Sequence, residues 1–432
     1  MLSFLTEDTK VITLLCGVFG QTISEKPLSP TEYSSLAQWL LGEGLHPKDL
    51  LHGNLVSDAA LGAGVDARRL KGLLGRGVQL GFVVEEWHRN GIWVMSRSDA
   101  DYPSRLKQHL KEQAPPLLFG AGDKTLLKGG GLGVVGSRNV DQDGEAFARQ
   151  VASLCARNGI IVVSGGARGV DQISMTAALE VGGYATGILA DNLLKKSTSH
   201  EFRKGIADGR LMLISPYHPA ARFTVGSAMG RNKLIYAMSD FGLVVSSDHN
   251  KGGTWAGAVE ELKRPRSRSV FVRIGDETPL GNHKLLDVGA IPWPELKEDI
   301  GLAQQLCNSA LSHSEKKQIE NLTLFDSFPS HNDELKGDFR RTIKDKTERT
   351  SSAQENNLAM SVSSPKHDAS LYPVVLPVLL DQIAEPASIE KLSVDLDVTK
   401  SQLRVWLDKA IAEGKVAKLT KPVRYQCANL DS

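Results

Sequence analysis

Residues 132–171 read LGVVGSRNVDQDGEAFARQVASLCARNGIIVVSGGARGVD, and this stretch decides the fold. Two short apolar runs, Leu132–Val135 and Ile160–Val163, bracket a stretch with helical character, Gly144–Arg157. A strand, a crossover helix and a second strand form a βαβ unit, and the two strands of such a unit are parallel. The stretch therefore predicts an α/β fold.

A loop of small residues with one arginine follows each of these two predicted strands. The loops are Gly136–Arg138 and Ser164–Gly169. In open α/β sheets such loops lie at the carboxyl ends of neighbouring strands, where ligands bind. Glycines let backbone N–H groups approach an anion, and arginine adds a planar set of donors. The two loops therefore predict a phosphate site, for a nucleotide or for a nucleic-acid strand.

The glycines Gly131, Gly133 and Gly136 also match the dinucleotide-binding fingerprint as a string. That fingerprint requires a strand before the first glycine and a helix that begins at the third. Here Lys128–Gly130 precedes the first glycine, and Val134–Val135 form part of the predicted strand itself. We therefore expect neither a nicotinamide site nor any other cofactor.

Strands and helices continue to alternate up to about residue 295. The further expected strands are Ala185–Leu189, Leu211–Ser215, Phe241–Ser246 and Ser269–Ile274. A helix is expected over Arg231–Ser239, and a third glycine loop, Lys251–Trp255, precedes another helix. This alternation, with valine- and isoleucine-rich strands, predicts a Rossmann-like, doubly wound parallel sheet.

Four segments are predicted along the chain. A helical N-terminal module (residues 1–90) either contacts protein or DNA or serves as a packing cap, and it includes a helix start at Ser29–Glu32. The sheet domain (91–300) follows, and then a largely disordered polar linker (301–370). Within it the apolar Leu322–Phe328 is either a docking segment or, as we expect, a strand packed on the sheet domain. Three helices and a hairpin then predict a C-terminal winged helix (371–432).

The predicted winged helix carries a local excess of basic residues. Such residues suit a phosphate backbone, although winged helices also make protein contacts. Both interpretations stay open. The candidate DNA contacts are Lys400, Arg404, Lys415, Lys418, Lys421 and Arg424.

Composition and net charge limit the kinds of binding site and the cellular compartment that the sequence is compatible with. The 432 residues carry a net charge of +1, so nucleic-acid binding has to come from local patches. Four scattered cysteines predict no metal site and no disulfide framework, and they favour a reducing, cytoplasmic compartment. No apolar run approaches the roughly 18 residues that span a bilayer, so no membrane association is expected.

Three motifs in order, Val135–Arg138, Ser164–Asp171 and Arg231–Ile235, resemble the DNA-processing protein A (DprA, also Smf) family. The runs Asp101–Pro103 and Gly289–Ile291 are similar to that family as well. The resemblance implies an extended Rossmann-like domain that binds single-stranded DNA. It also implies that the protein brings a RecA-type recombinase onto single strands, forms homodimers and is not a catalyst.

The loops and the resemblance together give the candidate site. Lys233 stands where the family usually has arginine, Asp171 would cap the next helix or orient Arg168, and Trp255 would stack on a base or fill the core. The candidate phosphate- or nucleic-acid-binding residues are Gly136, Ser137, Arg138, Ser164, Gly165, Gly166, Arg168, Gly169, Arg231, Asn232, Lys233, Lys251, Gly252, Gly253 and Thr254.

Departures from the family pattern motivate two alternatives. Met175 replaces a histidine, Ser246–Asp248 replaces a strand-ending glutamate, and Gly252–Trp255 replaces a Ser-Gly-Ser-Leu loop. The first alternative is a nucleotide-sensing regulator that acts on a toxin or defence-system partner. The second is a nucleoside-monophosphate phosphoribohydrolase with Glu260 or Glu261 as its acid or base.

Overall fold

The computed structural model describes residues 5–19, 25–52, 54–326, 372–383, 385–396, 400–420 and 423–427. The chain divides into two compact units, one formed by Met1–Ala310 with Ser370–Ser432 and the other by Leu311–Ala369. Apart from the second part of helix α14 (Leu302–Asp326), every element described below belongs to the first unit.

A nine-stranded sheet forms the centre of the first unit, in the order β1-β2-β6-β5-β4-β3-β7-β8-β9. The strands from β6 to β9 in this order are parallel, which confirms the predicted parallel sheet, whereas β1 and β2 extend it with antiparallel pairs. The strands are β1 (Trp93–Ser96), β2 (Leu117–Ala121), β3 (Leu132–Gly136), β4 (Val162–Ser164), β5 (Ala185–Ile188), β6 (Leu211–Ser215), β7 (Phe241–Ser246), β8 (Ser269–Val272) and β9 (Ile291–Pro292).

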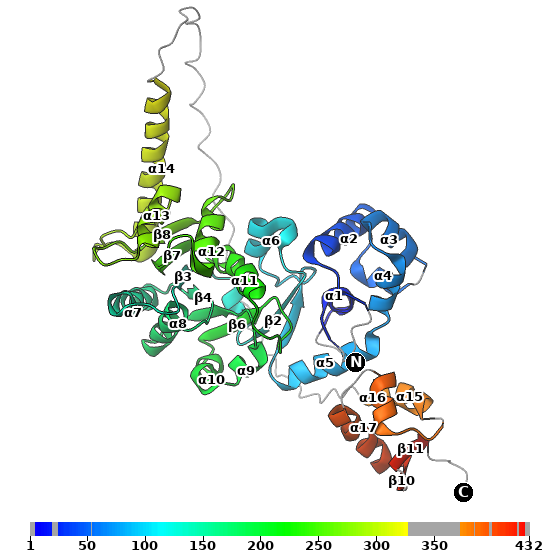
Figure 1. The fold of residues 1–432 in the computed structure, drawn as a ribbon. Coiled ribbons are helices and arrows are strands. Elements are labelled where there is room, and N and C mark those ends of the chain that lie inside the picture. Colours follow the sequence, from blue (N-terminus) through cyan, green and yellow to red (C-terminus); the bar gives the residue numbers. More distant parts are fainter. Residues whose placement is uncertain are drawn as a thin grey trace, which may run out of the picture. The chain divides into compact units, whose positions relative to one another are not determined.

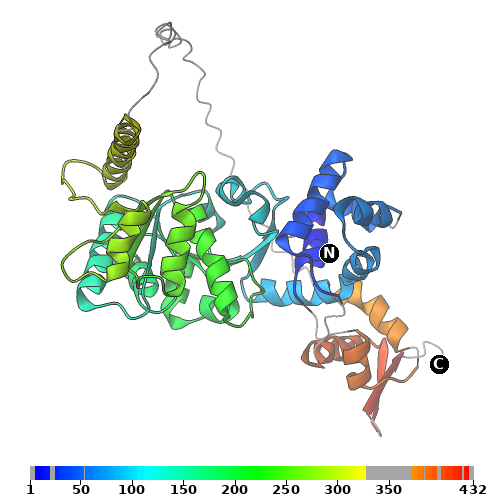
Figure 2. The same cartoon turned by 45° about the horizontal axis from the view of Figure 1, so that its top comes forward.

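Helices cover both faces of this sheet (Figures 1 and 2). Successive strand residues point to opposite faces. Accordingly, Val134 joins the hydrophobic cluster that contains Ala148, while Val135 joins the cluster that contains Leu234. The helices of the sheet domain are α6 (Ser104–Leu110), α7 (Gln142–Arg157), α8 (Val170–Glu180), α9 (Leu193–Ser197), α10 (His200–Ala207), α11 (Val225–Met238), α12 (Gly252–Leu262) and α13 (Leu280–Val288).

The strand order reverses at β3. The chain passes from β3 through β4 to β5 on one side, while β7 pairs with β3 on the other. The crevice outside the carboxyl ends of β3 and β7 is therefore the topological switch point, where open α/β sheets bind ligands. Gly133 and Gly136 lie within β3, so the glycine string lacks the strand–turn–helix context of a dinucleotide site.

Several predicted boundaries need correction. Strand β4 begins at Val162 rather than Ile160, and α11 begins at Val225 rather than near Gly230 because Thr224 and Ser227 form a capping box. Helix α14 occupies Leu302–Asp326, so a linker beginning at residue 301 is wrong for these residues. The expected strand at 322–328 is likewise wrong, since 322–326 are helical. Residues 327–371 lie outside the described part of the chain.

The N-terminal module is helical, as predicted. Ser29 and Glu32 form a capping box at the start of α2, because each side chain bonds to the other residue's backbone N–H, at 3.2 and 2.7 Å. Arg69 from α4 lies 2.6 Å from the Glu32 carboxylate. The helices of this module are α1 (Glu7–Cys16), α2 (Pro30–Gly42), α3 (Val56–Ala63), α4 (Ala67–Leu74) and α5 (Gly77–Arg89), with a 3₁₀ turn at Pro47–Leu51.

Glu32 gives the module a pH-dependent contact. The Arg69 hydrogen bond is the main reason that the pKa of Glu32 falls from 4.5 to about 2. Its stabilising contribution is therefore complete above pH 4.5 and is lost as the pH falls toward 2. We expect Glu32→Gln, which keeps the capping box, to lower stability near neutral pH by at most about 1 kcal/mol, because the pair is partly exposed. Melting curves of both proteins should converge at low pH, while the exposed Glu43→Gln control should show no such convergence.

The C-terminal elements follow the predicted order of three helices and a hairpin. They are α15 (Tyr372–Gln382), α16 (Ile389–Asp395), α17 (Lys400–Ala412), β10 (Val416–Thr420) and β11 (Val423–Cys427). Lys400 pairs with Glu390 at 3.0 Å, and Lys415 pairs with Glu413 at 2.8 Å. The winged-helix assignment and its DNA contacts stay predictions, and Lys421 lies outside the described residues.

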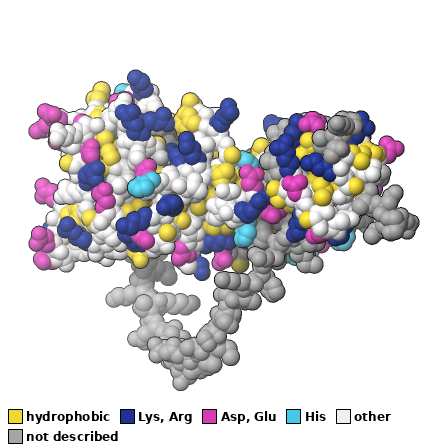
Figure 3. All heavy atoms as spheres, turned by 90° about the horizontal axis from the view of Figure 1, so that it is seen from below, with side chains coloured by type: hydrophobic (Ala, Val, Ile, Leu, Met, Phe, Trp, Pro, Cys, Tyr) yellow, Lys and Arg dark blue, Asp and Glu magenta, His cyan; other side chains and the backbone are white. Residues whose placement is uncertain are grey.

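Charges of both signs are interspersed over the face shown in Figure 3. Within the described part of the chain, no helix combines the length and apolar character needed to cross a membrane. Among the same residues, no group of three or more histidine, cysteine, aspartate or glutamate side chains is placed to hold a metal ion.

Candidate nucleic-acid interface

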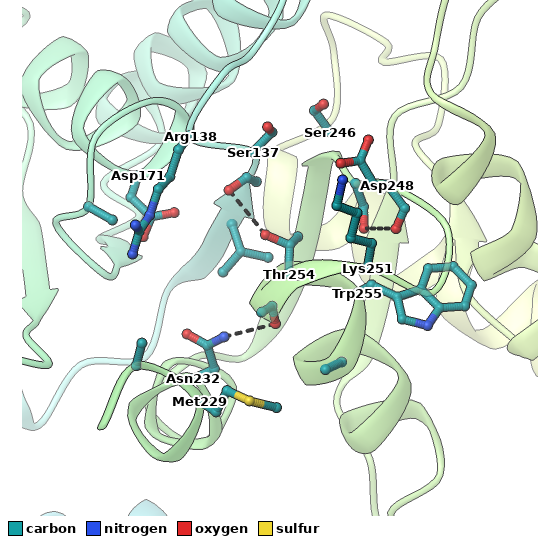
Figure 4. A pocket seen from close by; sticks show the side chains of 18 of the residues that line it. Ser137, Arg138, Asp171, Met229, Asn232, Ser246, Asp248, Lys251, Thr254 and Trp255 are labelled. Carbon is teal, nitrogen blue, oxygen red and sulfur yellow. Dashed lines mark hydrogen bonds between the residues drawn. The ribbon is translucent and has the colours of Figure 1, made fainter. Parts of the chain in front are cut away.

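A pocket of about 660 Å³ opens at the switch point between β3 and β7 (Figure 4). The loop after β3 and the loop after β7 supply two of its walls, and α11 and the first turn of α12 supply the others. We call it the switch-point pocket. The residues that line it include Gly136, Ser137, Arg138, Asp171, Phe223, Met229, Arg231, Asn232, Tyr236, Ser246, Ser247, Asp248, Asn250, Lys251, Gly252, Gly253, Thr254 and Trp255.

The β3 side of the pocket meets the start of α12. The Thr254 hydroxyl donates to the Gly136 carbonyl at 3.1 Å, which joins the first turn of α12 to the end of β3. Gly252 has a φ of +81°, a backbone conformation that favours glycine. The first N–H groups of a helix have no partner within the helix and carry a partial positive charge. With Lys251 as the residue before α12, this end of the pocket suits an anion.

A buried ion pair lies beneath the pocket. Arg231 Nη1 lies 3.4 Å from Asp171 Oδ2, and the two side chains are only 6% and 8% exposed. Burial raises the pKa of Asp171, and the neighbouring Arg231 guanidinium opposes that rise. A Cβ atom on Gly165 would lie 1.3 Å from Arg231 Nη1, so the pair requires glycine there. Asp171 therefore orients Arg231, not Arg168, and Gly169 rather than Asp171 is the N-cap residue of α8.

One hydrogen-bond donor of Arg231 has no partner among the described residues. This donor is the Nε atom, which is buried. A buried donor without a partner is costly, and it often marks a place where a ligand or water completes the site. Because Arg231 lines the switch-point pocket, an anion bound there has a fixed guanidinium beside it.

A second pocket of about 650 Å³ adjoins the first, and we call it the β4–β5 pocket. Arg138, Ala167, Phe223 and Arg231 line both pockets, so the two form one groove along the carboxyl edge of the sheet. The loop after β4 contributes Arg168 to this pocket. The segment after β5 contributes Asp191, Asn192, Lys195 and Lys196.

Two arginines are held at the groove by their neighbours. The Arg138 guanidinium lies over the Phe223 ring, 4.9 Å from its centroid, and Phe223 is 44% exposed. Arg168 Nη2 donates to Asn139 Oδ1 at 3.2 Å. These contacts keep both guanidinium groups extended at the protein surface, where a phosphate can reach them.

Most of the sequence-predicted site residues meet in this groove, but three do not line it. Ser164 is buried and donates to the Val134 carbonyl at 2.6 Å. Gly169 caps α8 with a φ of +88° and packs on the Arg138 backbone. Lys233 pairs with Glu260 at 3.0 Å instead. The predicted residues that line the groove are Gly136, Ser137, Arg138, Gly165, Gly166, Arg168, Arg231, Asn232, Lys251, Gly252, Gly253 and Thr254.

Sequence reasoning missed Lys195, Lys196 and Phe223. The sequence did contain a signal for the two lysines, because they come after the predicted strand Ala185–Leu189, as Arg138 and Arg168 come after theirs. Extending the carboxyl-edge rule to that strand would have identified them. Phe223 carried no such signal, because its place beside Arg138 depends on how the segment before α11 folds back over the sheet edge.

The carboxylates that the hydrolase alternative needs are engaged elsewhere. Glu261 is 2% exposed, lies 2.9 Å from His109 Nε2 and accepts a hydrogen bond from the Arg268 backbone. Glu260 pairs with Lys233 and with Arg264. Neither glutamate lines the switch-point pocket. The geometry therefore does not bring Glu260 or Glu261 to the pocket, where the hydrolase alternative needs an acid or base.

Comparisons with known proteins agree with this architecture. Residues 93–301 match the family described as DNA recombination-mediator protein A. The chain is 29% identical over 215 residues to the DNA processing protein DprA of Bacillus subtilis, a match that spans 48% of this chain and 70% of the relative. It is 30% identical over 192 residues to the Smf protein of Escherichia coli, a match that spans 43% of this chain and only 50% of the relative.

The X-ray structure of DprA from Streptococcus pneumoniae shares the fold. It matches with a TM-score of 0.51 and 21% identity, and the match covers 66% of this chain and 94% of that chain. Residues 93–301, which hold the sheet and the groove at its carboxyl edge, thus match the DNA recombination-mediator protein A (DprA/Smf) family in sequence, and the Streptococcus pneumoniae DprA structure shares the fold.

Proposed function

We propose that the groove binds single-stranded DNA. The observation that carries this proposal is the continuity of the two pockets, which share Arg138, Phe223 and Arg231. A single nucleotide fits within either pocket, whereas a groove through both accommodates consecutive phosphates of one strand. The basic residues that line the groove are Arg138, Arg168, Lys195, Lys196, Arg231 and Lys251.

The rim of the groove favours an unpaired strand over a duplex. Phe223, Val225 and Met229 are 44%, 69% and 45% exposed, and all three lie beside the phosphate-binding loops. Exposed apolar side chains gathered in this way mark an interaction site. A duplex presents mainly phosphates at its outer surface, whereas a single strand offers phosphates and base faces together. The pairing of basic and apolar surface therefore fits a single strand.

We infer a role in DNA recombination from the similarity to this family. We infer that the chain, as a homodimer, delivers single-stranded DNA to a RecA-type recombinase. The relatives are named for DNA processing, and the family is described as a recombination mediator. Co-sedimentation of the chain with a RecA-type recombinase, with and without single-stranded DNA, tests this inference. Recovery of the recombinase only when the chain is present supports it, and equal recovery without the chain contradicts it.

The direct test of the proposed function is salt-dependent binding of a fluorescent single-stranded oligonucleotide. Three or four phosphate contacts predict that affinity falls roughly 15- to 60-fold between about 50 and 200 mM salt, since each contact releases counterions. A hairpin duplex of the same composition is the control, and it should bind more weakly at both salt concentrations. Affinity that does not change with salt would contradict the phosphate groove.

The switch-point pocket alone supports a second candidate, a nucleotide-sensing regulator. Its volume of about 660 Å³ lies within the range of small-ligand sites, and it combines an anion-binding end with an apolar wall. A panel of nucleoside mono- and diphosphates in a thermal-shift assay tests this candidate, because a ligand that binds the folded state raises the melting temperature. Stabilisation by oligonucleotides but by no mononucleotide would exclude it.

A further inference from the structure

We propose that Trp255 is the stacking platform for a nucleobase in the switch-point pocket. This inference rests on the proposed function and adds the residue that receives the base. The pocket combines two kinds of lining. Arg138 and Lys251 suit a phosphate, whereas Met229 and Trp255 contribute apolar surface, and Trp255 lies in the first turn of α12, which Lys251 precedes. A ligand that carries an anion beside a planar aromatic group is a nucleotide.

Trp255 lies in the first turn of α12, on the outer side of the pocket (Figure 4). It is half-buried, it lines the pocket, and it also packs against the hydrophobic cluster that contains Leu234. Its ring contacts the ring of His249, at 4.9 Å between centroids and with the planes 89° apart. Among the described residues, the indole N–H donates no hydrogen bond. A tryptophan that served only the core would be buried, with its N–H bonded.

The backbone of the first turn of α12, which carries Trp255, is held against α11. Asn232 on α11 donates to the Gly253 carbonyl at 3.0 Å, and this bond fixes the first turn of α12 against α11 (Figure 4). Cβ atoms on Gly253 and Gly257 would each lie 3.3 Å from the Asn232 side chain, so both glycines allow this close approach. A platform fixed before binding loses little freedom when a base stacks on it.

Intrinsic fluorescence measures the stacking directly, because a base in contact with an indole quenches its emission. Titration of the full chain with a short single-stranded oligonucleotide should quench part of the emission of the wild type. Trp255→Phe should lose this quenching, and Trp255→Leu should bind roughly 5- to 150-fold more weakly, the range typical of one stacked base. Trp293→Phe is the control, since Trp293 packs between Phe147 and Phe271 and does not line the groove.

The outcomes separate this inference from the function on which it rests. Quenching that survives in Trp255→Phe, together with unchanged affinity of Trp255→Leu, overturns the stacking role while the salt-sensitive binding still stands. A wild type that binds no oligonucleotide overturns both. Quenching that disappears only in Trp255→Phe, with an unchanged melting temperature, supports the platform and excludes a general unfolding effect.

Discussion

The double variant Arg138→Ala, Arg168→Ala is expected to bind a single-stranded oligonucleotide at least about 100-fold more weakly than the wild type. Each guanidinium follows a strand of the sheet and lines the groove, where it can donate charge-assisted hydrogen bonds to a phosphate. Losing two such contacts, each worth about 1.5–3 kcal/mol, accounts for this factor. The salt dependence should also become shallower, because fewer counterions are released. Fluorescence anisotropy at two salt concentrations measures both effects.

A charge-matched control separates local contacts from the overall charge. Arg157 and Arg266 are exposed and line neither pocket. Arg157→Ala, Arg266→Ala removes the same formal charge, and we expect less than about a threefold loss of affinity, the effect of general screening alone. Equal losses in the two double variants would show that binding is diffuse rather than centred on the groove.

Asp171→Ala is expected to destabilise the sheet domain by about 3–5 kcal/mol, the cost of leaving a buried charge without its partner. Arg231 is only 5% exposed, and Asp171 is the acidic side chain with which it pairs among the described residues. Without the carboxylate, the guanidinium would remain in a poorly solvated place or force the groove to open. Calorimetric melting of the wild type and the variant measures the loss.

The pair can also be replaced as a whole. Asp171→Ala, Arg231→Met removes both charges and keeps apolar volume, so most of the lost stability should return. Oligonucleotide binding by this double variant should be weaker than that of the wild type, because Arg231 lines both pockets. A double variant that melts no higher than Asp171→Ala would contradict the ion-pair explanation. A double variant that binds as tightly as the wild type would remove Arg231 from the interface.

The sequence by itself determined the sheet and the approximate place of the site. Residues 132–171 contain two strands, a helix and two glycine loops, and local propensity with strand order is enough to bring Arg138 and Arg168 to one edge. The capping box at Ser29–Glu32 was equally readable, because both partners lie within one helical turn. These features depend on residues close together in the chain.

Only the tertiary structure decided which charged side chains serve the site. Arg231 and Asp171 are 60 residues apart in sequence and meet because α11 and α8 approach the same strand ends. Glu261 meets His109 across 152 residues, and Lys233 turns to Glu260, so neither reaches the groove. Ion pairs and stacking contacts depend on distances of a few ångströms between separate elements. Sequence periodicity predicts the elements but not those distances, and packing against the shared sheet determines them.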